Sequence, residues 1–339
     1  MPYKFKAGES VPESVRRIVV EEMESAASQL EKPAGPQREE GIHEARKSLK
    51  KTRALLRLMK SELGGARKTE NTRLREHGRK LSELRDAGAI VNAFDDLLAA
   101  SPNGKGHDSL NAIREGLVAR RDQAMDQAGI EERLKGMAKS FRAIAKGVKS
   151  WPLKTDGYAA IKSGLEASFR AGRKAMARAE RQPRPENFHE WRKRAKDHWY
   201  HVRLLEPLWS DVMQASEKSL KELETWLGDD HNLVVLRDKV FSEPDLCAND
   251  KATDLLVRLI ERRQKELRKN SLALGARIYC EEKPREFSRR MRRLWDAWQA
   301  APKSLEKAEE ESPAQSAPPR KGAASKSRPK SARAATTAA

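Results

Sequence analysis

Apolar residues recur at helical spacing along most of the chain. In the first predicted segment Val15, Ile18, Val19 and Met23 lie on one stripe, as expected when each residue of a helix turns by about 100°. Runs of β-branched and aromatic residues that alternate with polar ones, the usual pattern of strands, are almost absent. The pattern therefore predicts an all-α fold.

Prolines and glycines divide this pattern into separate predicted helices. Proline lacks the amide hydrogen that a helix interior needs, and glycine is a poor helix former, so both residues mark boundaries. The predicted breaks lie at residues 31–36, 64–65, 101–104, 151–152, 183–185, 207 and 243–244. The helices between them are predicted at about residues 12–32, 42–63, 71–98, 108–128, 130–150, 158–181, 188–206, 211–241, 255–278 and 287–298.

The segment from Ile42 to Met59 carries two stripes that lie side by side on one helix. The basic stripe holds a histidine and five cationic residues: His43, Arg46, Lys47, Lys50, Arg53 and Arg57. The neighbouring apolar stripe consists of Ile42, Ala45, Leu49, Leu56 and Met59. In an ordinary amphipathic helix the charges face water on the side opposite the core. Here they border the buried face, which predicts a basic wall facing a cleft.

The same pattern returns 146 positions later, without a gap. The second basic stripe consists of His189, Arg192, Lys193, Lys196 and Arg203, and the register holds onward to Leu74 and Leu81, which meet Leu220 and Leu227. It departs where Trp199 replaces Arg53 and where Asn232 replaces Asp86. The repeat predicts an internally duplicated pair of helical bundles, about residues 5–152 and 155–301, related by a pseudo-two-fold axis. Two halves packed face to face would line one shared channel with both stripes.

Charge points to a polyanionic partner. The 339 residues include 69 Lys and Arg against 50 Asp and Glu, a formal net charge of +19. Only +4 of this belongs to residues 302–339, so the body of the chain is itself basic. Such a field favours nucleic acid, polyphosphate or an anionic surface. The segment 302–339 is rich in Ala, Ser, Pro, Lys and Arg and is predicted to be a disordered tail.

The sequence offers little support for a membrane segment, a disulfide or a metal site. There is no apolar run of about 18 residues and no apolar signal-peptide core, so a soluble, cytoplasmic protein is expected. Cys247 and Cys280 are far apart and fit a reduced compartment. A zinc-protease helix needs a second histidine four residues after the first, where Lys47 and Lys193 stand, so no metal or other cofactor is predicted.

Several motifs resemble the conserved histidine α-helical domain, the CHAD domain, over roughly residues 5–300. In the first half they are the segment 43–47 with Arg53, and the segment 84–86; in the second half they are the segments 188–193 and 227–228. The segments 170–173 and 283–287, the latter with Trp295, also resemble the family. The resemblance implies a domain at residues 1–301 made of two pseudo-symmetric helical bundles around a basic central cavity. It further implies binding of inorganic polyphosphate without catalysis, and some members associate with polyphosphate granules.

The two basic stripes suit such a ligand on physical grounds as well. Residues at i, i+3, i+7 and i+10 of a helix are separated by about 5 Å in rise, which matches successive phosphates, and Arg can bind two oxygens at once. The predicted polyphosphate-binding residues are His43, Arg46, Lys47, Lys50, Arg53, Arg57, His189, Arg192, Lys193, Lys196 and Arg203. Arg75, Arg79, Arg173 and Lys221 either extend this lining or belong to the surface. Asp86 is expected to orient a neighbouring arginine or to cap a local backbone group.

Other interpretations remain open from the sequence. Either stripe alone would read as a solvated basic face with a core histidine, and the repeat is what favours phosphate contact. A nucleic-acid-binding protein is the main alternative, since the tail resembles those that coat DNA, although no helix-turn-helix, zinc finger or RNA-recognition motif is present. A phosphohydrolase or polyphosphate kinase is less well supported, because no Walker loop, carboxylate cluster or activated nucleophile is evident. The sequence leaves the oligomeric state undefined.

Overall fold

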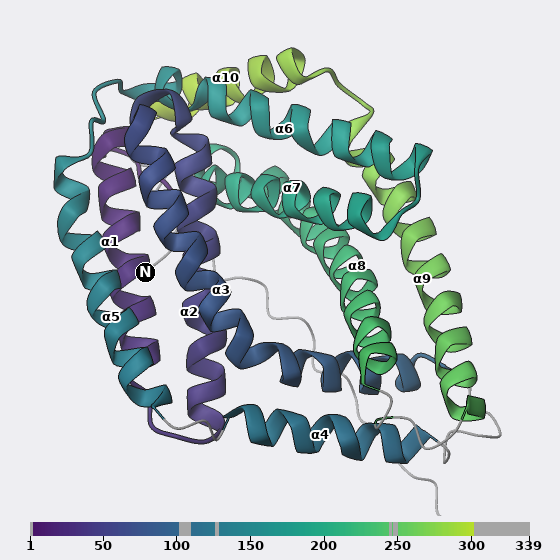
Figure 1. Cartoon of the computed structure of the whole chain (residues 1–339). Coiled ribbons are helices and arrows are strands. Elements are labelled where there is room, and N and C mark those ends of the chain that lie inside the picture. The colour runs from purple at the N-terminus through teal and green to yellow at the C-terminus, as the bar shows by residue number, and fades with distance from the viewer. Residues whose placement is uncertain (1–2, 102–109, 126–128, 244–245, 247–249, 302–339) are drawn as a thin grey trace, which may run out of the picture. The chain divides into compact units, whose positions relative to one another are not determined.

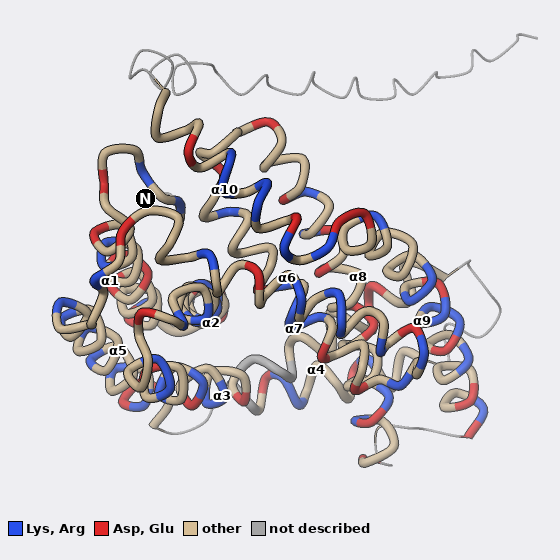
Figure 2. Tube along the Cα trace, turned by 90° about the horizontal axis from the view of Figure 1, so that it is seen from above, with Lys and Arg blue, Asp and Glu red and all other residues tan. Residues whose placement is uncertain are grey.

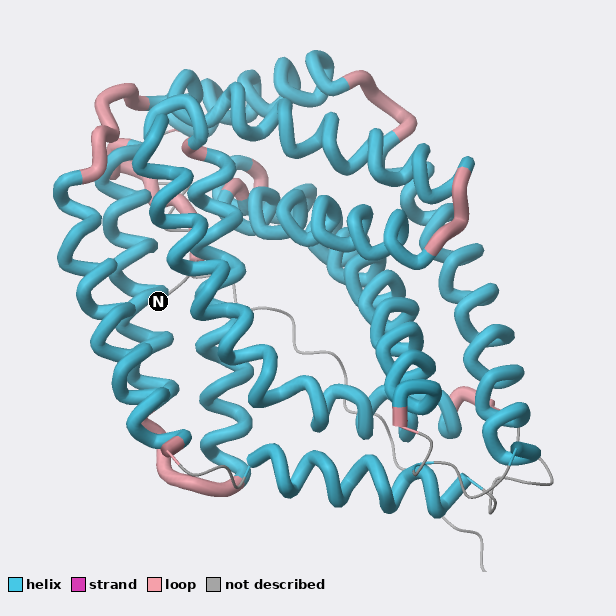
Figure 3. Tube along the Cα trace, viewed as in Figure 1, coloured by secondary structure: helices cyan, strands magenta, loops and turns pink. Residues whose placement is uncertain are grey.

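The computed structural model describes residues 3–101, 110–125, 129–243, 246 and 250–301, without the side chains of residues 85–87, 124 and 125. Within these residues the chain is helical and no strand is present, which confirms the predicted all-α class (Figures 1 and 3). The helices are α1 (Val11–Leu30), α2 (Pro36–Leu58), α3 (Lys60–Ala99), α4 (Asn111–Met125), α5 (Ile130–Gly147), α6 (Gly157–Arg181), α7 (Pro185–Leu204), α8 (Ser210–Ser242), α9 (Asp250–Tyr279) and α10 (Pro284–Ala300), with short 3₁₀ segments η2 (Val148–Ser150) and η3 (Glu206–Leu208). The predicted tail and Cys247 lie outside the described residues.

Local signals explain where the first helices begin. Ser10 caps α1, its hydroxyl accepting a bond from the Glu13 amide while the Glu13 carboxylate accepts one from the Ser10 amide. Proline occupies one of the first two positions of α1, α2 and α7, where its missing amide hydrogen is not needed. The first basic helix therefore starts at Pro36, about two turns before the first residue of its basic stripe, His43.

The prediction was wrong at the junction of α2 and α3. It placed the end of the basic helix near Gly64 and Gly65 and the start of the next near residue 71, whereas α2 ends at Leu58 and helix resumes at Lys60. Gly64 breaks the helical path with a φ of 46° and a ψ of −124°, a conformation that glycine adopts without steric strain. The predicted break at the glycine pair is therefore present, and what the prediction missed is the earlier boundary at Met59, where α2 ends.

Contacts between helices divide the chain into a unit Met1–Gln299 and a unit Ala300–Ala339, and only the first is considered further. Its larger hydrophobic core joins α1, α2, α5, α6, α7 and α10, with Phe141, Phe169 and Trp191 among its fully buried side chains. A second core joins the distal ends of α3 and α8 to α4 and α9 around Phe94 and Ile260. No described helix is long and apolar enough to cross a membrane.

Helices far apart in sequence pack together at two places. Near the larger core α2 contacts both α6 and α7, and near the second core α3 contacts α8 and α9 (Figure 1). The sequential pairs α1–α2, α2–α3, α6–α7, α7–α8 and α8–α9 fill the intervening parts of the unit. The two basic helices are thus brought into direct contact, which is the feature of the fold that positions the candidate site.

Gly164 permits α6 to approach the end of α2, and its substitution tests this packing. A Cβ atom at this position would lie 1.8 Å from the Leu58 carbonyl oxygen, which cannot move without disrupting α2. We expect Gly164→Ala to lower the free energy of unfolding by about 3 kcal/mol or more. Gly136 in α5 is the matched control: a Cβ there meets nothing within 4 Å, so Gly136→Ala should raise stability by about 0.5–1 kcal/mol. Equal effects of the two substitutions in urea unfolding would contradict the close approach.

Candidate functional site

The crossing of α2 and α7 is fixed by two polar contacts. His201 of α7 lies 2.9 Å from the Ala54 carbonyl of α2, and its Nε2–H donates to that oxygen. Burial lowers the pKa of His201 to about 4, so the ring is neutral at physiological pH. Arg57 of α2 donates to the Asp197 carboxylate of α7 at 2.9 Å. These contacts set the register in which the two basic stripes meet.

Lys50 lies where the stripes converge. Burial, together with the nearby cations Lys196, Arg46 and Arg192, lowers the pKa of its amine well below the ordinary value. The Glu224 carboxylate opposes these effects, because its negative charge raises the pKa of the Lys50 amine. Within the described residues Lys50 makes no hydrogen bond or ion pair of its own. The fold therefore concentrates positive charge from two helices at one partly buried place.

Glu224 of α8 is the carboxylate at the centre of this group. One of its oxygens lies 2.6 Å from the Lys196 amine and 3.2 Å from the Arg192 guanidinium, and the other lies 3.1 Å from the Lys221 amine. Burial would raise its pKa, but these cations lower the pKa to about 2, so the side chain remains ionised. We use the name cation cluster for the five cations of this group together with the carboxylate at its centre: Arg46, Lys50, Arg192, Lys196, Lys221 and Glu224.

Gly228 explains how Arg192 reaches the cluster. A Cβ atom at this position would lie 3.2 Å from Arg192 Nε and 3.3 Å from one of its terminal nitrogens. The guanidinium therefore lies directly on the backbone of α8, one turn after Glu224. Arg192 Nε is buried and has no hydrogen-bond partner within the described residues, so part of its donor capacity is not used by the protein.

Lys47 and Lys193 lie about one turn before Lys50 and Lys196 on the same two helices. Each pairs with a glutamate three residues earlier on its own helix, Lys47 with Glu44 at 2.8 Å and Lys193 with Glu190 at 3.5 Å. Their side chains remain 43% and 53% exposed. Exposed pairs of this kind are weak, so both amines are available to an external anion.

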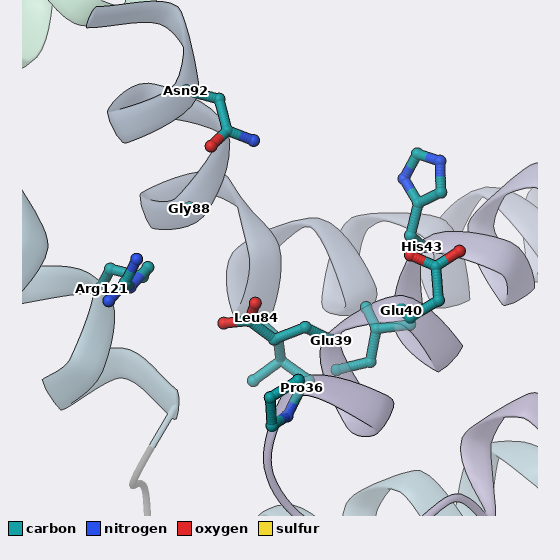
Figure 4. A pocket seen from close by; sticks show the side chains of 9 residues that line it. Pro36, Glu39, Glu40, His43, Leu84, Gly88, Asn92 and Arg121 are labelled. Carbon is teal, nitrogen blue, oxygen red and sulfur yellow. The ribbon is translucent and has the colours of Figure 1, made fainter. Parts of the chain in front are cut away.

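The two motif histidines lie in different surroundings. The His189 ring lies 3.9 Å from the His231 ring of α8, and burial with the nearby cations lowers the pKa of each to about 4. His189 Nδ1 is buried without a hydrogen-bond partner within the described residues. His43 instead faces a cavity of about 270 Å³ (Figure 4). The cavity is lined by Pro36, Glu39, Glu40, Ile42, His43, Leu84, Gly88, Asn92 and Arg121, so it mixes acidic and basic groups.

The three predicted phosphate ligands nearest the C-terminal ends of α2 and α7 also have partners within the protein. Arg57 pairs with Asp197, and Arg53 donates to the Asn71 side chain at 3.1 Å. Burial and the adjacent Arg57 lower the pKa of Arg53 to about 10. The third, Arg203, lies 3.1 Å from a carboxylate oxygen of Glu217 and packs over the rings of two aromatic residues. The far ends of the stripes therefore have structural partners of their own.

The four additional lining residues fall into different places. Lys221 joins the cation cluster and also lies over the Trp199 ring at 4.9 Å. Arg79 is exposed and pairs with Glu83 on its own helix. Arg75 is exposed beside Arg53. Arg173 donates to the backbone carbonyl of residue 282 near the start of α10, and within the part of the chain that the structure describes no hydrogen bond or ion pair joins it to the cluster. The Asp86 side chain lies outside the described part of the chain.

Sequence reasoning missed Glu224, His231 and Asp197 as members of the site. The internal repeat did not single out Glu224, because the residue 146 positions before it is Gly78 and not an acidic residue. His231 stands opposite Arg85 in that register and is one of seven histidines, so it could have been singled out. Within the described residues no group of three or more His, Cys, Asp and Glu side chains is placed to hold a metal ion.

The position of Lys50 predicts a pH-dependent gain in stability for Lys50→Met. The unfolded chain keeps a proton on this amine up to a pKa near 10.5, whereas the folded chain binds it less tightly. The charged amine therefore opposes folding at neutral pH, and this penalty fades as pH rises toward the unfolded value. Thermal unfolding should show Lys50→Met melting a few degrees above the wild type at pH 7, with a smaller gap at pH 10.

Lys47→Met provides the control for this measurement, because Lys47 is more exposed and lies one turn away on the same helix. Its melting temperature should follow the wild type at both pH values within about 2 °C. A Lys50→Met variant that is less stable than the wild type at pH 7, or a gap independent of pH, would contradict the described environment of Lys50.

Comparison with known proteins identifies the family. No curated protein matches the sequence. The family model described as the CHAD domain matches residues 23–240, which include both basic helices and the cation cluster. The match covers well over half of the chain. The chain therefore belongs to the CHAD domain family.

Proposed function

We propose that this protein binds inorganic polyphosphate, without catalysing its turnover, through the facing basic stripes of α2 and α7. The observation that carries the proposal is the environment of Lys50, whose amine lies among Lys196, Arg46 and Arg192. Cations that repel one another are stabilised when a polyanion lies between them. Membership of the CHAD family, which is associated with polyphosphate binding, supports the same ligand.

Polyphosphate suits this arrangement better than a single small anion does. It carries about one charge per phosphate and presents oxygens at regular spacing, so it needs a row of cations on a rigid support. Lys47 and Lys193 provide exposed amines on either helix, and Lys50 and Lys196 lie one turn further along. A chain of phosphates that lies between the helices would contact both pairs. Arg192, with its unused Nε donor, provides a further contact.

We further propose that the two basic helices arose by duplication and form one shared channel. Supporting this, the 146-residue register aligns α2 with α7, and five α-helices precede the 3₁₀ segment η2 just as five follow it in the described chain. In both halves the basic helix packs against the helix before it and the helix after it. The residues proposed to contact phosphate are His43, Arg46, Lys47, Lys50, His189, Arg192, Lys193 and Lys196, with Lys221 at the edge.

Nucleic-acid binding is the second candidate, and one observation favours it. The exposed side of α10 carries arginines at 285, 289, 290, 292 and 293, on a helix distinct from α2 and α7 (Figure 2). Arg290 and Arg292 pair with Glu282 and Asp296, whereas the other three have no ion pair within the described residues. Such a surface binds phosphates without reading sequence. It predicts an interaction that does not depend on Lys50 or Lys196.

Binding of labelled long polyphosphate to the full chain tests the proposal. The double variant Lys50→Ala/Lys196→Ala should lose affinity by about tenfold or more and reduce the slope of log K against log salt by about 1.4, since two phosphate contacts disappear. The matched control is Lys149→Ala/Arg289→Ala, which removes two exposed charges elsewhere. The control should stay within about threefold of the wild type, because only the general field of the protein changes.

Three results would contradict the proposal. Equal losses in the two double variants would show that only net charge matters. Displacement of polyphosphate by an equal phosphate concentration of DNA, with binding lost in the control variant, would favour the second candidate. Release of phosphate from polyphosphate in the presence of Mg²⁺ by the purified protein, abolished in Lys50→Ala/Lys196→Ala, would show an enzyme.

A further inference from the structure

The carboxylate of Glu224 lies at the centre of the cation cluster. Three cationic side chains from two helices point at it, with Lys196 at 2.6 Å, Lys221 at 3.1 Å and Arg192 at 3.2 Å. The Glu224 side chain is only 5% exposed, so its contacts with Arg192 and Lys196 are largely shielded from water and salt, whereas the Lys221 side chain is 52% exposed. Carboxylate and phosphate oxygens accept bonds from the same donors in the same geometry.

We propose that Glu224 is a built-in competing anion that fills a phosphate subsite formed by Arg192, Lys196 and Lys221, and so disfavours small phosphates relative to long chains. The inference rests on the proposed function, because it assigns a selectivity to the same site. Binding of a phosphate in this subsite requires Glu224 to turn away or to share its three cations.

The charge balance of the subsite supports this role. One carboxylate faces three cations there, and Lys50 is a fourth cation close enough to respond to it. Without an external ligand the carboxylate relieves repulsion that would otherwise destabilise the packing of α7 against α8. The cluster is nevertheless left with a positive excess. An incoming polyanion can neutralise this remaining positive charge.

The two basic stripes differ in whether the matching position of the following helix supplies a carboxylate. In the 146-residue register the position matching Glu224 is Gly78, which has no side chain. The second half therefore supplies a carboxylate to its own stripe that the first half does not supply from the matching position. An anion that engages the α2 side meets no carboxylate from that position. An anion that enters the α7 side must compete with Glu224.

Glu224 competes more strongly with short phosphates than with long polyphosphate because its carboxylate is held beside the cations by the protein itself. A side chain held beside its cations competes at an effective concentration that is at least in the millimolar range. Orthophosphate or tripolyphosphate has few contacts besides the subsite and bears this competition in full. A long chain can bind Lys47, Lys50 and Lys193 while Glu224 stays in place. Glu224 therefore weakens small phosphates more than long ones.

Substitution of Glu224 by glutamine tests the proposal in the full chain. Calorimetric titration should show that Glu224→Gln binds orthophosphate and tripolyphosphate about tenfold more tightly than the wild type, since the competing charge is removed. Its affinity for long polyphosphate should rise by less than about threefold, so the ratio between long and short ligands falls. Glu222→Gln is the matched control, because it removes the same charge from an exposed position of α8. It should leave all three affinities within about twofold.

The outcomes separate this inference from the proposed function. A folded Glu224→Gln protein with unchanged orthophosphate and tripolyphosphate affinity would overturn the role of Glu224, even if long polyphosphate binds as proposed. Tighter orthophosphate binding by the variant, with no polyphosphate binding by any form, would support the subsite and overturn the proposed function.

Glu224→Asp provides a second variant if the glutamine variant does not fold, because it keeps the charge and shortens the side chain by one methylene. It should bind tripolyphosphate more tightly than the wild type by about threefold, since the carboxylate reaches the cations less well. Unchanged tripolyphosphate affinity in a folded Glu224→Asp protein would overturn the proposal.

Discussion

Repulsion between partly buried cations at the crossing of α2 and α7 is the constraint on which the site depends. Lys50 of α2 and Lys196 of α7 come from different helices, and the charges of Lys196 and Arg192 lower the pKa of the Lys50 amine. The fold sustains this because Glu224 supplies one buried carboxylate and because large apolar cores hold the helices elsewhere. Charge of one sign held in place at the expense of stability is typical of a site prepared for a ligand of the other sign.

The residues of each basic stripe therefore have two different roles. At the far end, Arg57 pairs with Asp197 and Arg53 bonds to Asn71, so these arginines serve the packing of α2 against its neighbours. Near the cluster, exposed lysines hold only weak pairs on their own helices. A single pattern of basic residues therefore contains both structural and ligand-accessible groups. Their separation is set by which other helices supply carboxylates.

Periodicity predicted much of this structure, and its failures have physical causes. Helix positions, the all-α class and the adjacency of basic and apolar stripes on α2 follow from local spacing, which is encoded within one segment. Glu224, Asp197 and His231 were missed because their roles arise from contacts between helices, which spacing within one helix does not reveal. The end of α2 at Leu58 was missed because neither a proline nor a glycine marks it. Duplication and the shared channel remain proposals.

Lysine footprinting with and without long polyphosphate tests the central claim most directly. The exposed amines of Lys47 and Lys193 border the proposed binding surface, whereas Lys149 and Lys162 are exposed elsewhere on the unit. Acetylation followed by mass spectrometry reports each amine separately. If polyphosphate lies between α2 and α7, Lys47 and Lys193 should react several-fold more slowly in its presence while Lys149 and Lys162 react at the same rate. Uniform protection of all four, or protection of Lys149 and Lys162 alone, would contradict the account.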